Sequence, residues 1–428
     1  MAKKSKLQAA SDALAAPQQP YYLQRAQIKD FRSIRDSNVE FRAGLNIIIG
    51  ANGSGKTNFV RCLQNSLDKL SPSFNGDVEL YISGREELIV RPTKQSTATE
   101  DDLLNGNSYY DNKQRLIELS TGGVNFYGES FSSAHLKYKS ELASADKSCL
   151  LSLIAISHGI PTPYHLIDVA EDFEIDPRFI GHNNFENSLF VTALVTSISR
   201  ALLFINGIPS INGVPKIKGP LPTHKQVGAA LHEVEKFYLN FLVPQLKQFT
   251  PISNLRFTAS YNTYANSSQH RVIVKGITID FKINSDWLPF SALSSGTQRL
   301  FYILSETVAS LLVLPKKNLY RTTTYDKIIL LEEPELGIHP DQLEKLLLFL
   351  REQSEKHQVI ITTHSPQVLD MLNEDELDRI TICELHKTKG TQFRKLKKAQ
   401  IATAQQFMKE KGVFLSDYWR YGNLEGTN

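Results

Sequence analysis

The chain has 428 residues, 41% of them hydrophobic, and a formal net charge of +3. This length allows two or three domains with a large core, and so small a net charge gives no general attraction to nucleic acid. The cysteines Cys62, Cys149 and Cys383 lie far apart in the sequence, so neither a disulfide framework nor a zinc site is indicated.

Two segments bear on localisation. Residues 1–20 carry three lysines followed by a mixture of alanine, serine, glutamine and proline, which predicts a disordered tail and not a signal peptide. The most apolar stretch, residues 189–205, is interrupted by Thr192, Ser197, Ser199 and Arg200 and falls short of a membrane-spanning helix. We therefore expect a cytoplasmic protein with no membrane contact.

Strands are predicted over residues 23–31, 39–41 and 46–49. The third is followed by Gly-Ala-Asn-Gly-Ser-Gly-Lys-Thr at residues 50–57 and then by apolar residues at helical intervals, the order typical of a phosphate-binding loop. Inward-pointing N–H groups and a lysine bind the phosphates in such loops, and a threonine hydroxyl binds Mg²⁺. The cofactors expected are therefore ATP and Mg²⁺, and the contacting residues are Asn52, Gly53, Ser54, Gly55, Lys56 and Thr57, with Thr57 also a metal ligand.

Residues 58–292 separate this loop from the next motif, so a large insertion is predicted near residues 95–270. Its first part, to residue 133, is rich in Asn, Gly, Ser and Tyr and predicts loops with short strands. Its middle predicts helices, with residues 149–156, 189–205 and 227–246 as the best candidates. Because no long heptad pattern occurs, we expect a compact, mainly helical insertion instead of a coiled-coil arm.

Three motifs follow the insertion. Leu-Ser-Ser-Gly-Thr-Gln at residues 293–298 opens a periodic helix, and a serine and a glycine at a helix start form an anion site. A buried-strand pattern at residues 328–331 ends in the acids of residues 332–335, which suit Mg²⁺ coordination and water activation. A further strand pattern, residues 359–363, ends at His364. Taken alone, one acid could be a solvated strand-end residue and the histidine a loop residue, but their order behind a phosphate loop favours function.

This ordered set resembles the ABC-type ATPase heads of the SMC, RecF and OLD proteins, over about residues 22–90 and 275–428. The wording Glu-Glu-Pro-Glu followed by Leu-Gly-Ile-His-Pro resembles OLD-type ATPases in particular. The resemblance implies an α/β fold, a P-loop ABC-type head in which a mixed sheet with flanking helices is formed by residues 21–94 and 271–428. The signature departs from the usual Leu-Ser-Gly-Gly-Gln, since Ser295 replaces the first glycine and Thr297 the glutamine.

The resemblance also implies roles for individual residues. Lys56 and Thr57 would hold phosphates and metal, Glu332 would support Mg²⁺, and Glu333 would polarise the attacking water. His364 would sense the γ-phosphate as the switch histidine. Arg32 is a candidate nucleotide contact, although an exposed arginine in a turn is an equal interpretation.

In such heads the signature helix of one copy faces the phosphate loop of another, so ATP joins two copies. The resemblance implies that Ser294, Ser295 and Gly296 complete the nucleotide site of a partner copy, and that residues 335–340 cross the interface. Hydrolysis would release the two faces, a ligand-driven shift between two states. The expected partner is therefore a second copy of the chain, in a dimer or a higher oligomer.

Residues 379–385 and 391–396 predict a hairpin, and no acid occurs from residue 386 to residue 409. The basic residues of this segment are Lys387, Lys389, Arg394, Lys395, Lys397 and Lys398. The 387–398 segment could contact DNA or an acidic partner, although solvated basic hairpins are common.

Stand-alone OLD-like ATPases of this size resemble the ATPase subunits of phage-defence systems such as PARIS and Septu. We therefore expect a sensor and scaffold that controls a separate nuclease or toxin effector, because residues 365–428 are too few for the nuclease domain of OLD proteins. Two alternatives stay open: a DNA-repair ATPase of RecF or SMC type that binds duplex DNA directly, and a scaffold that binds ATP with negligible hydrolysis.

Overall fold

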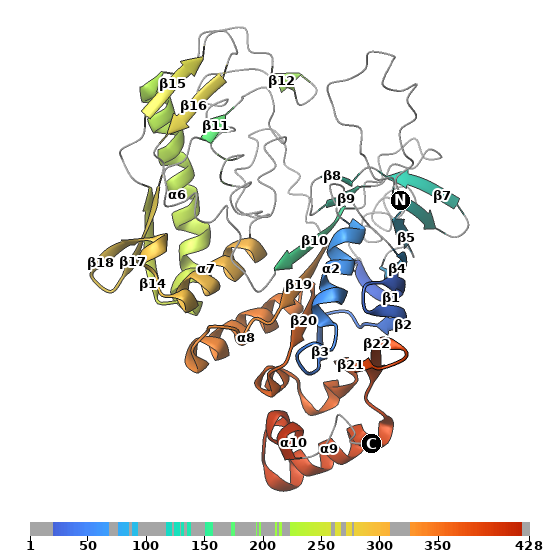
Figure 1. Cartoon of the computed structure of the whole chain (residues 1–428). Coiled ribbons are helices and arrows are strands. Elements are labelled where there is room, and N and C mark those ends of the chain that lie inside the picture. The colour runs from blue at the N-terminus through green and yellow to red at the C-terminus, as the bar shows by residue number, and fades with distance from the viewer. Residues whose placement is uncertain are drawn as a thin grey trace, which may run out of the picture.

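Figure 1 shows the computed structural model of the chain. The described residues are 20–67, 76–84, 88–92, 117–121, 124–128, 130–131, 135–137, 150–156, 173–175, 194, 197, 210–211, 214–215, 223–257, 262–266, 271–275, 278–308 and 326–421. The expected tail, residues 1–20, lies outside them apart from Pro20.

A 14-stranded mixed sheet forms the centre of the described residues. Neighbouring strands run parallel in the order β21 (Ile380–His386), β3 (Leu45–Ile49), β20 (Gln358–Thr363), β19 (Asp326–Glu332) and β10 (Leu150–Ile156). On the β21 side the order continues outward with β22 (Gly390–Lys395), β2 (Ile34–Glu40), β1 (Tyr22–Phe31), β4 (Asp77–Ser83), β5 (Leu88–Pro92), β6 (Ile117–Thr121) and β7 (Val124–Gly128). Beyond β10 lie β9 (His135–Lys137) and β8 (Ser130–Phe131).

Both faces of the parallel strands are buried, because successive side chains point to opposite sides of a sheet. One face packs with α2 (Lys56–Leu67) and with the inner sides of β1, β2 and β4, and its strand residues are Ile48, Ile328, Leu330 and Ile360. The other face packs with α6 (His224–Phe249), α7 (Ser295–Val308) and α8 (Pro340–Ser354), and its strand residues are Ile47, Ile329, Leu331 and Ile361. The helix after the phosphate loop and the signature helix therefore lie on opposite faces of the sheet.

Smaller elements surround this core (Figure 1). A three-stranded sheet of β14 (Ile252–Phe257), β17 (Ile279–Ile283) and β18 (Asp286–Pro289) continues from α6. The remaining short strands are β11 (Phe173–Ile175), β12 (Ser210–Ile211), β13 (Val214–Pro215), β15 (Asn262–Asn266) and β16 (Arg271–Lys275). After β20, the chain forms the 3₁₀ segments η4 (Pro366–Met371) and η5 (Glu374–Arg379), the β21–β22 hairpin, α9 (Lys398–Lys411) and α10 (Leu415–Tyr421). Short η2 (Phe290–Ala292) precedes α7.

The structure confirms the strands predicted at 23–31, 46–49, 328–331 and 359–363, the hairpin of 379–396 and the helix of 227–246. Strand β2 is longer than the predicted 39–41 and ends at Glu40. Residues 189–205 lie outside the described residues apart from 194 and 197, which are helical.

The helix predicted at residues 149–156 is wrong, because this segment is strand β10. A short apolar run cannot be assigned by periodicity alone, and here pairing with β19 decides its conformation. β10 lies inside the predicted insertion yet belongs to the central sheet. In the described part of residues 95–270, α6 is accompanied by many short strands, so this part is less helical than expected, and the domain boundaries stay a prediction.

Candidate nucleotide-binding site

The phosphate-binding loop connects the buried strand β3 to the start of α2. Gly55 has a φ of +109° and lies against the β21–β22 hairpin, where an added Cβ would come within 2.0 Å of Thr391 Oγ1. A residue with a side chain would therefore be both strained and blocked at this position. Glycine here allows the loop to turn tightly enough to bring its backbone around an anion.

Thr391 closes the loop from the far end of the chain. Its hydroxyl donates to the carbonyl oxygen of Ser54 at 2.9 Å, and its backbone N–H donates to the carbonyl oxygen of Ser33 at 2.8 Å. The sequence motif does not include this residue, and its isolated position after a glycine gave no signal. The shape of the loop thus depends on β22 as well as on β3 and α2.

Lys56 turns back onto the loop that precedes it. Its side chain is buried, and Nζ donates to the carbonyl oxygens of Gly50 at 2.8 Å and Ala51 at 3.0 Å. Glu333 Oε1 lies 4.0 Å from the same nitrogen. A buried ammonium at the centre of a glycine loop suits the phosphates of a nucleotide. Charged phosphate oxygens could take the place of the two neutral carbonyl oxygens as hydrogen-bond acceptors.

The two acids after β19 face different surroundings. Glu332 is buried at the end of the strand, whereas Glu333 is partly exposed and has a φ of +46°. A left-handed conformation is uncommon outside glycine and costs about 1–3 kcal/mol, so the surrounding structure must hold it. A hydrogen bond from Glu333 N to the carbonyl oxygen of Thr362, 2.8 Å long, contributes to this. The turn directs the Glu333 carboxylate toward Lys56 and away from the strand.

His364 follows β20 and lies between two carboxylates. Its Nδ1 is 3.4 Å from Glu333 Oε1 and 3.5 Å from Glu335 Oε1. Glu335 Oε1 also accepts hydrogen bonds from the His364 backbone N–H, at 3.3 Å, and from the Thr363 hydroxyl. Glu335, with a side chain only 8% exposed, therefore fixes the position of the imidazole. The sequence placed Glu335 in the interface loop, and its contact with His364 was missed because it arises between two strand ends.

The signature residues form the start of α7. Ser294 Oγ accepts a hydrogen bond from Thr297 N at 3.3 Å, which makes it the N-terminal cap, and both Ser294 and Ser295 are exposed. Gly296 is buried against the 335–340 loop, where an added Cβ would lie 3.0 Å from the carbonyl oxygen of Gly337. Within the described residues, none of these three signature positions bonds to residues 50–57 of the same chain.

Arg299 ties the signature helix to the acids. Its Nη2 donates to the carbonyl oxygen of Glu332 at 3.0 Å, and the residue is 3% exposed. Burial lowers the pKa of this guanidinium below its usual value, while Tyr302 and the three acids after β19 oppose that shift. The sequence analysis missed Arg299, although a charged residue among apolar helix positions was a usable signal.

The other sequence-predicted residues lie around the loop. Arg32 occupies the turn between β1 and β2, with Nη1 3.5 Å from Asn58 Oδ1 at the start of α2. Asn52 and Gly53 are exposed, Ser54 is buried, and Thr57 is half-buried. The arrangement brings Arg32 beside the loop, and its contact with nucleotide stays a prediction.

Thr57 and Glu332 are the predicted Mg²⁺ ligands. In the described part of the chain, no group of three or more His, Cys, Asp or Glu side chains could hold a metal ion alone. Mg²⁺ is commonly bound by one or two protein groups together with phosphate oxygens and water. A buried carboxylate at a strand end beside a phosphate loop has the hard oxygen chemistry that Mg²⁺ prefers.

A phosphate-binding loop after β3, with carboxylates at the end of β19 two strands away, defines a P-loop nucleotide-binding domain. A family described as "AAA domain, putative AbiEii toxin, Type IV TA system" matches residues 230–370, and a second, described as "AAA domain", matches residues 25–142. The first match contains the signature, the acids and His364, and the second contains the phosphate loop.

Similar proteins include the DNA double-strand break repair Rad50 ATPase of Methanocaldococcus jannaschii, 27% identical over 38% of this chain and 16% of that protein. The DNA replication and repair protein RecF of Renibacterium salmoninarum is 34% identical over 16% of this chain and 18% of that protein. The matched regions thus span less than a fifth of either relative. Over these parts, the chain is similar to AAA/ABC-type ATPases of the SMC, Rad50 and RecF type.

Among solved structures, one of the recombination mediator protein RecF aligns with 89% of this chain and 99% of its own, at 13% identity and a TM-score of 0.42. Among the described residues, no helix is long and apolar enough to cross a membrane.

Proposed function

We propose that this protein binds ATP with Mg²⁺ and hydrolyses it between two copies of the chain. The observation that carries the proposal is the convergence of Lys56 and His364 on Glu333, whose Oε1 lies 4.0 Å from Lys56 Nζ and 3.4 Å from His364 Nδ1. These residues come from the ends of three adjacent parallel strands, where ligands of open α/β sheets bind. Mg²⁺, when bound, would neutralise charge on the phosphates.

The residues divide the chemistry. Lys56 and the loop N–H groups bind and orient the phosphates, and Thr57 and Glu332 hold the metal. Glu333, the exposed member of the acid pair, polarises a water molecule, and its strained backbone is a feature often found at functional sites. His364 donates a hydrogen bond to the γ-phosphate, with Glu335 holding the ring in place.

Dimerisation is supported by the separation of the two half-sites. Ser294 and Ser295 are exposed and bond to nothing in the phosphate loop of the same chain. Leu336, in the adjacent loop, is 45% exposed and adds an apolar side chain to this surface. A partner's nucleotide would cover this surface.

The test is ATP turnover measured as a function of protein concentration. Ser295→Arg should abolish turnover and dimerisation while a single chain still binds ATP, and Ser285→Arg, at an exposed turn between β17 and β18, should change neither. Equal turnover by the Ser295→Arg variant would refute a shared site. Binding without turnover in the unaltered protein would favour a non-hydrolysing scaffold.

For the biological role, we infer an OLD-like sensor and scaffold that controls a separate nuclease or toxin in antiviral defence. The description of the family that matches residues 230–370 names a toxin of a type IV system, which supports such a context. The effector would be encoded beside this chain, bind its ATP-loaded form and be released on hydrolysis. Copurification of that neighbour with the Glu333→Gln variant, and its loss with Lys56→Ala, tests the proposal.

The alternative, a repair ATPase that binds duplex DNA directly, is favoured by the names of the relatives. Two basic side chains of the 387–398 segment, on which direct DNA contact would depend, are already engaged or buried. Arg394 bonds to Glu384 at 2.6 Å, and Lys395 Nζ is buried, so Lys387, Lys389, Lys397 and Lys398 are the exposed lysines of the hairpin and its end. DNA binding that falls steeply with salt, and more gently after Lys397 and Lys398 are neutralised, would favour the repair role.

A further inference from the structure

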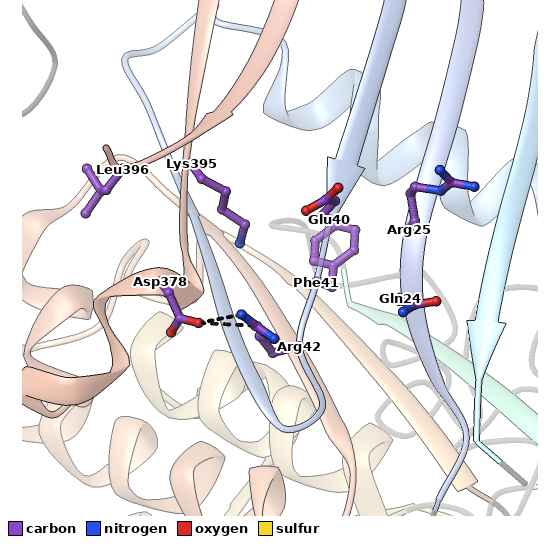
Figure 2. Close-up of a pocket in the computed structure, with 8 residues that line it drawn as sticks. All are labelled: Gln24, Arg25, Glu40, Phe41, Arg42, Asp378, Lys395 and Leu396. Carbon is purple, nitrogen blue, oxygen red and sulfur yellow. Dashed lines mark hydrogen bonds and ion pairs between the residues drawn. The ribbon is translucent and has the colours of Figure 1, made fainter. Parts of the chain in front are cut away.

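A polar pocket lies at the ends of strands β2 and β22 that are far from the phosphate-binding loop. β2 and β22 begin beside the loop, where Thr391 N donates to the carbonyl oxygen of Ser33. At the other ends of these strands, Glu40 and Lys395 line a pocket of about 420 Å³ (Figure 2). Thr391 and Lys395 are four positions apart on β22, a distance of roughly 13 Å. This pocket, which we call the β22 pocket, is therefore separate from the nucleotide site.

The charges of the β22 pocket do not balance. Figure 2 shows Arg42 paired with Asp378, and both Nε and Nη2 of Arg42 lie 3.1 Å from Asp378 Oδ2. Arg25 stacks over the ring of Tyr81, with its guanidinium carbon 3.8 Å from the ring centroid. Glu40 is exposed at the rim. The charge of Asp378 offsets that of Arg42, and the charge of Glu40 offsets that of Arg25. The positive charge of Lys395 is therefore not offset by any acid that lines the pocket.

Lys395 is the residue that distinguishes this pocket from an ordinary surface hollow. Its side chain extends into the space between Phe41 and the Arg42–Asp378 pair (Figure 2). Its Nζ is buried and has no hydrogen-bond acceptor among the described residues. Burial lowers the pKa of Lys395 to about 8, with Asp378 and Glu40 opposing the shift and Arg42 and Arg379 adding to it. An ammonium with three unused donors is costly to bury, so an added acceptor would be favourable.

The walls of the pocket are held before any ligand enters. The Gln358 side chain bonds to both the N–H and the carbonyl oxygen of Leu23, each at 2.8 Å, and to the carbonyl oxygen of Arg42 at 3.0 Å. Phe41 N donates to the carbonyl oxygen of Gln24 at 2.8 Å. Because these bonds fix the ends of β1 and β2, a ligand would lose little free energy in ordering the site.

We propose that the β22 pocket binds a small molecule through one oxyanion, a phosphate or a carboxylate, that pairs with Lys395. Because Lys395 supplies the one positive charge that no acid of the pocket offsets, a compact ligand with one anionic group fits better than a nucleic acid. The site is independent of the ATPase proposal.

The test is competitive acetylation of the full chain over a range of pH, with each lysine quantified by peptide mass spectrometry. Inorganic phosphate and succinate serve as probes, and sodium chloride of equal ionic strength as the blank. Either probe should raise the titration midpoint of Lys395 above about 8 and slow its acetylation. Lys397, two residues further on and exposed, should not change. A shift with phosphate alone or with succinate alone identifies the kind of ligand, and no shift with either overturns the proposal.

Phosphate also binds phosphate loops, so the experiment is repeated in the Lys56→Ala variant. The Lys395 shift should persist there, and its disappearance would assign the effect to the nucleotide site and overturn the proposal. In a parallel measurement, the effective probe should raise the melting temperature of Lys56→Ala and of Lys56→Ala with Lys397→Met. It should not raise that of Lys56→Ala with Lys395→Met, and an equal rise in all three would also overturn it.

Discussion

The two ends of the parallel strands differ in how they hold charge. At the carboxyl ends, Glu333 forms potential ion pairs with Lys56 and His364. At the amino ends, burial lowers the pKa of Lys327 to about 8 and of His357 to about 4, which favours the uncharged forms. Lys327 Nζ there donates to the carbonyl oxygen of Thr307 at 3.2 Å. The comparison teaches that opposite charges are brought together at one end of the strands, whereas burial disfavours charge at the other.

If this division is correct, substitutions at the carboxyl ends change function and leave stability intact, whereas substitutions at the amino ends do the reverse. The largest effect is expected for Glu333→Gln, which keeps the shape of the side chain and removes its basicity. Turnover should fall by about 10²–10³-fold, because general-base catalysis contributes on this scale. The ATP-bound dimer should accumulate, as seen by gel filtration, with an unchanged melting temperature. Hydrolysis at the original rate would contradict the assignment of the base.

Lys56→Ala should weaken ATP binding by about 10–100-fold, because charge-assisted hydrogen bonds to phosphate contribute about 1.5–3 kcal/mol. Titration calorimetry in the presence of Mg²⁺ measures the affinity. The matched control is Lys345→Ala, at an exposed position of α8, which should bind ATP normally. Equal ATP affinities for the two variants would show that Lys56 does not bind the phosphates.

A smaller effect is expected for Glu335→Gln, because the amide oxygen can still accept from Thr363 and His364 but carries no charge. We expect kcat to fall about tenfold with little change in KM, since a neutral partner orients and supports the imidazole less well. Glu344→Gln on the exposed side of α8 is the control. A loss of stability in place of a loss of kcat would show that Glu335 serves packing.

At the amino end, His357 predicts a pH effect on stability alone. The pKa of His357 is about 4 in the folded protein, against 6.5 for the unperturbed group. The unfolded chain therefore binds more protons between these values, and the free energy of unfolding falls as the pH drops from about 6.5 to about 4. Because the residue is partly exposed, the loss attributable to it is roughly 1–2 kcal/mol.

His357→Gln should flatten this pH dependence in urea unfolding experiments, while ATP turnover at pH 7.5 stays the same. The control is His232→Gln, whose side chain is 74% exposed. If the free energy of unfolding of the His357 variant depended on pH as steeply between pH 4 and pH 6.5 as that of the unaltered protein, His357 would not be the cause of the pH effect.

The sequence predicted best what local chemistry determines. The phosphate loop needs its glycines, lysine and threonine at fixed spacing, and strands such as residues 328–331 and 359–363 are short, mainly apolar runs next to polar ends. The same kind of run misled at residues 149–156, because a buried strand and a buried helix of seven residues look alike until a partner strand is known.

The parts of the site that were missed come from contacts between distant segments. Glu335 meets His364 because β19 and β20 are neighbours, and Arg299 meets Glu332 because α7 crosses the end of β19. The hydrophobic periodicity of a sequence does not predict such long-range contacts. Contacts between two copies cannot be inferred from such patterns either, so it stays a prediction that Ser294 and Ser295 complete the nucleotide site of a partner copy.

The bond between Thr391 and Ser54 has a consequence for biosynthesis. Its two residues are 337 positions apart, and β3 is paired on both sides by strands made late, β20 and β21. A ribosome adding about 5–20 residues per second reaches Thr391 roughly 20–70 s after Ser54. During translation the nascent chain therefore carries an unclosed glycine loop, and the capacity to take up a triphosphate arises late, when the C-terminal hairpin emerges.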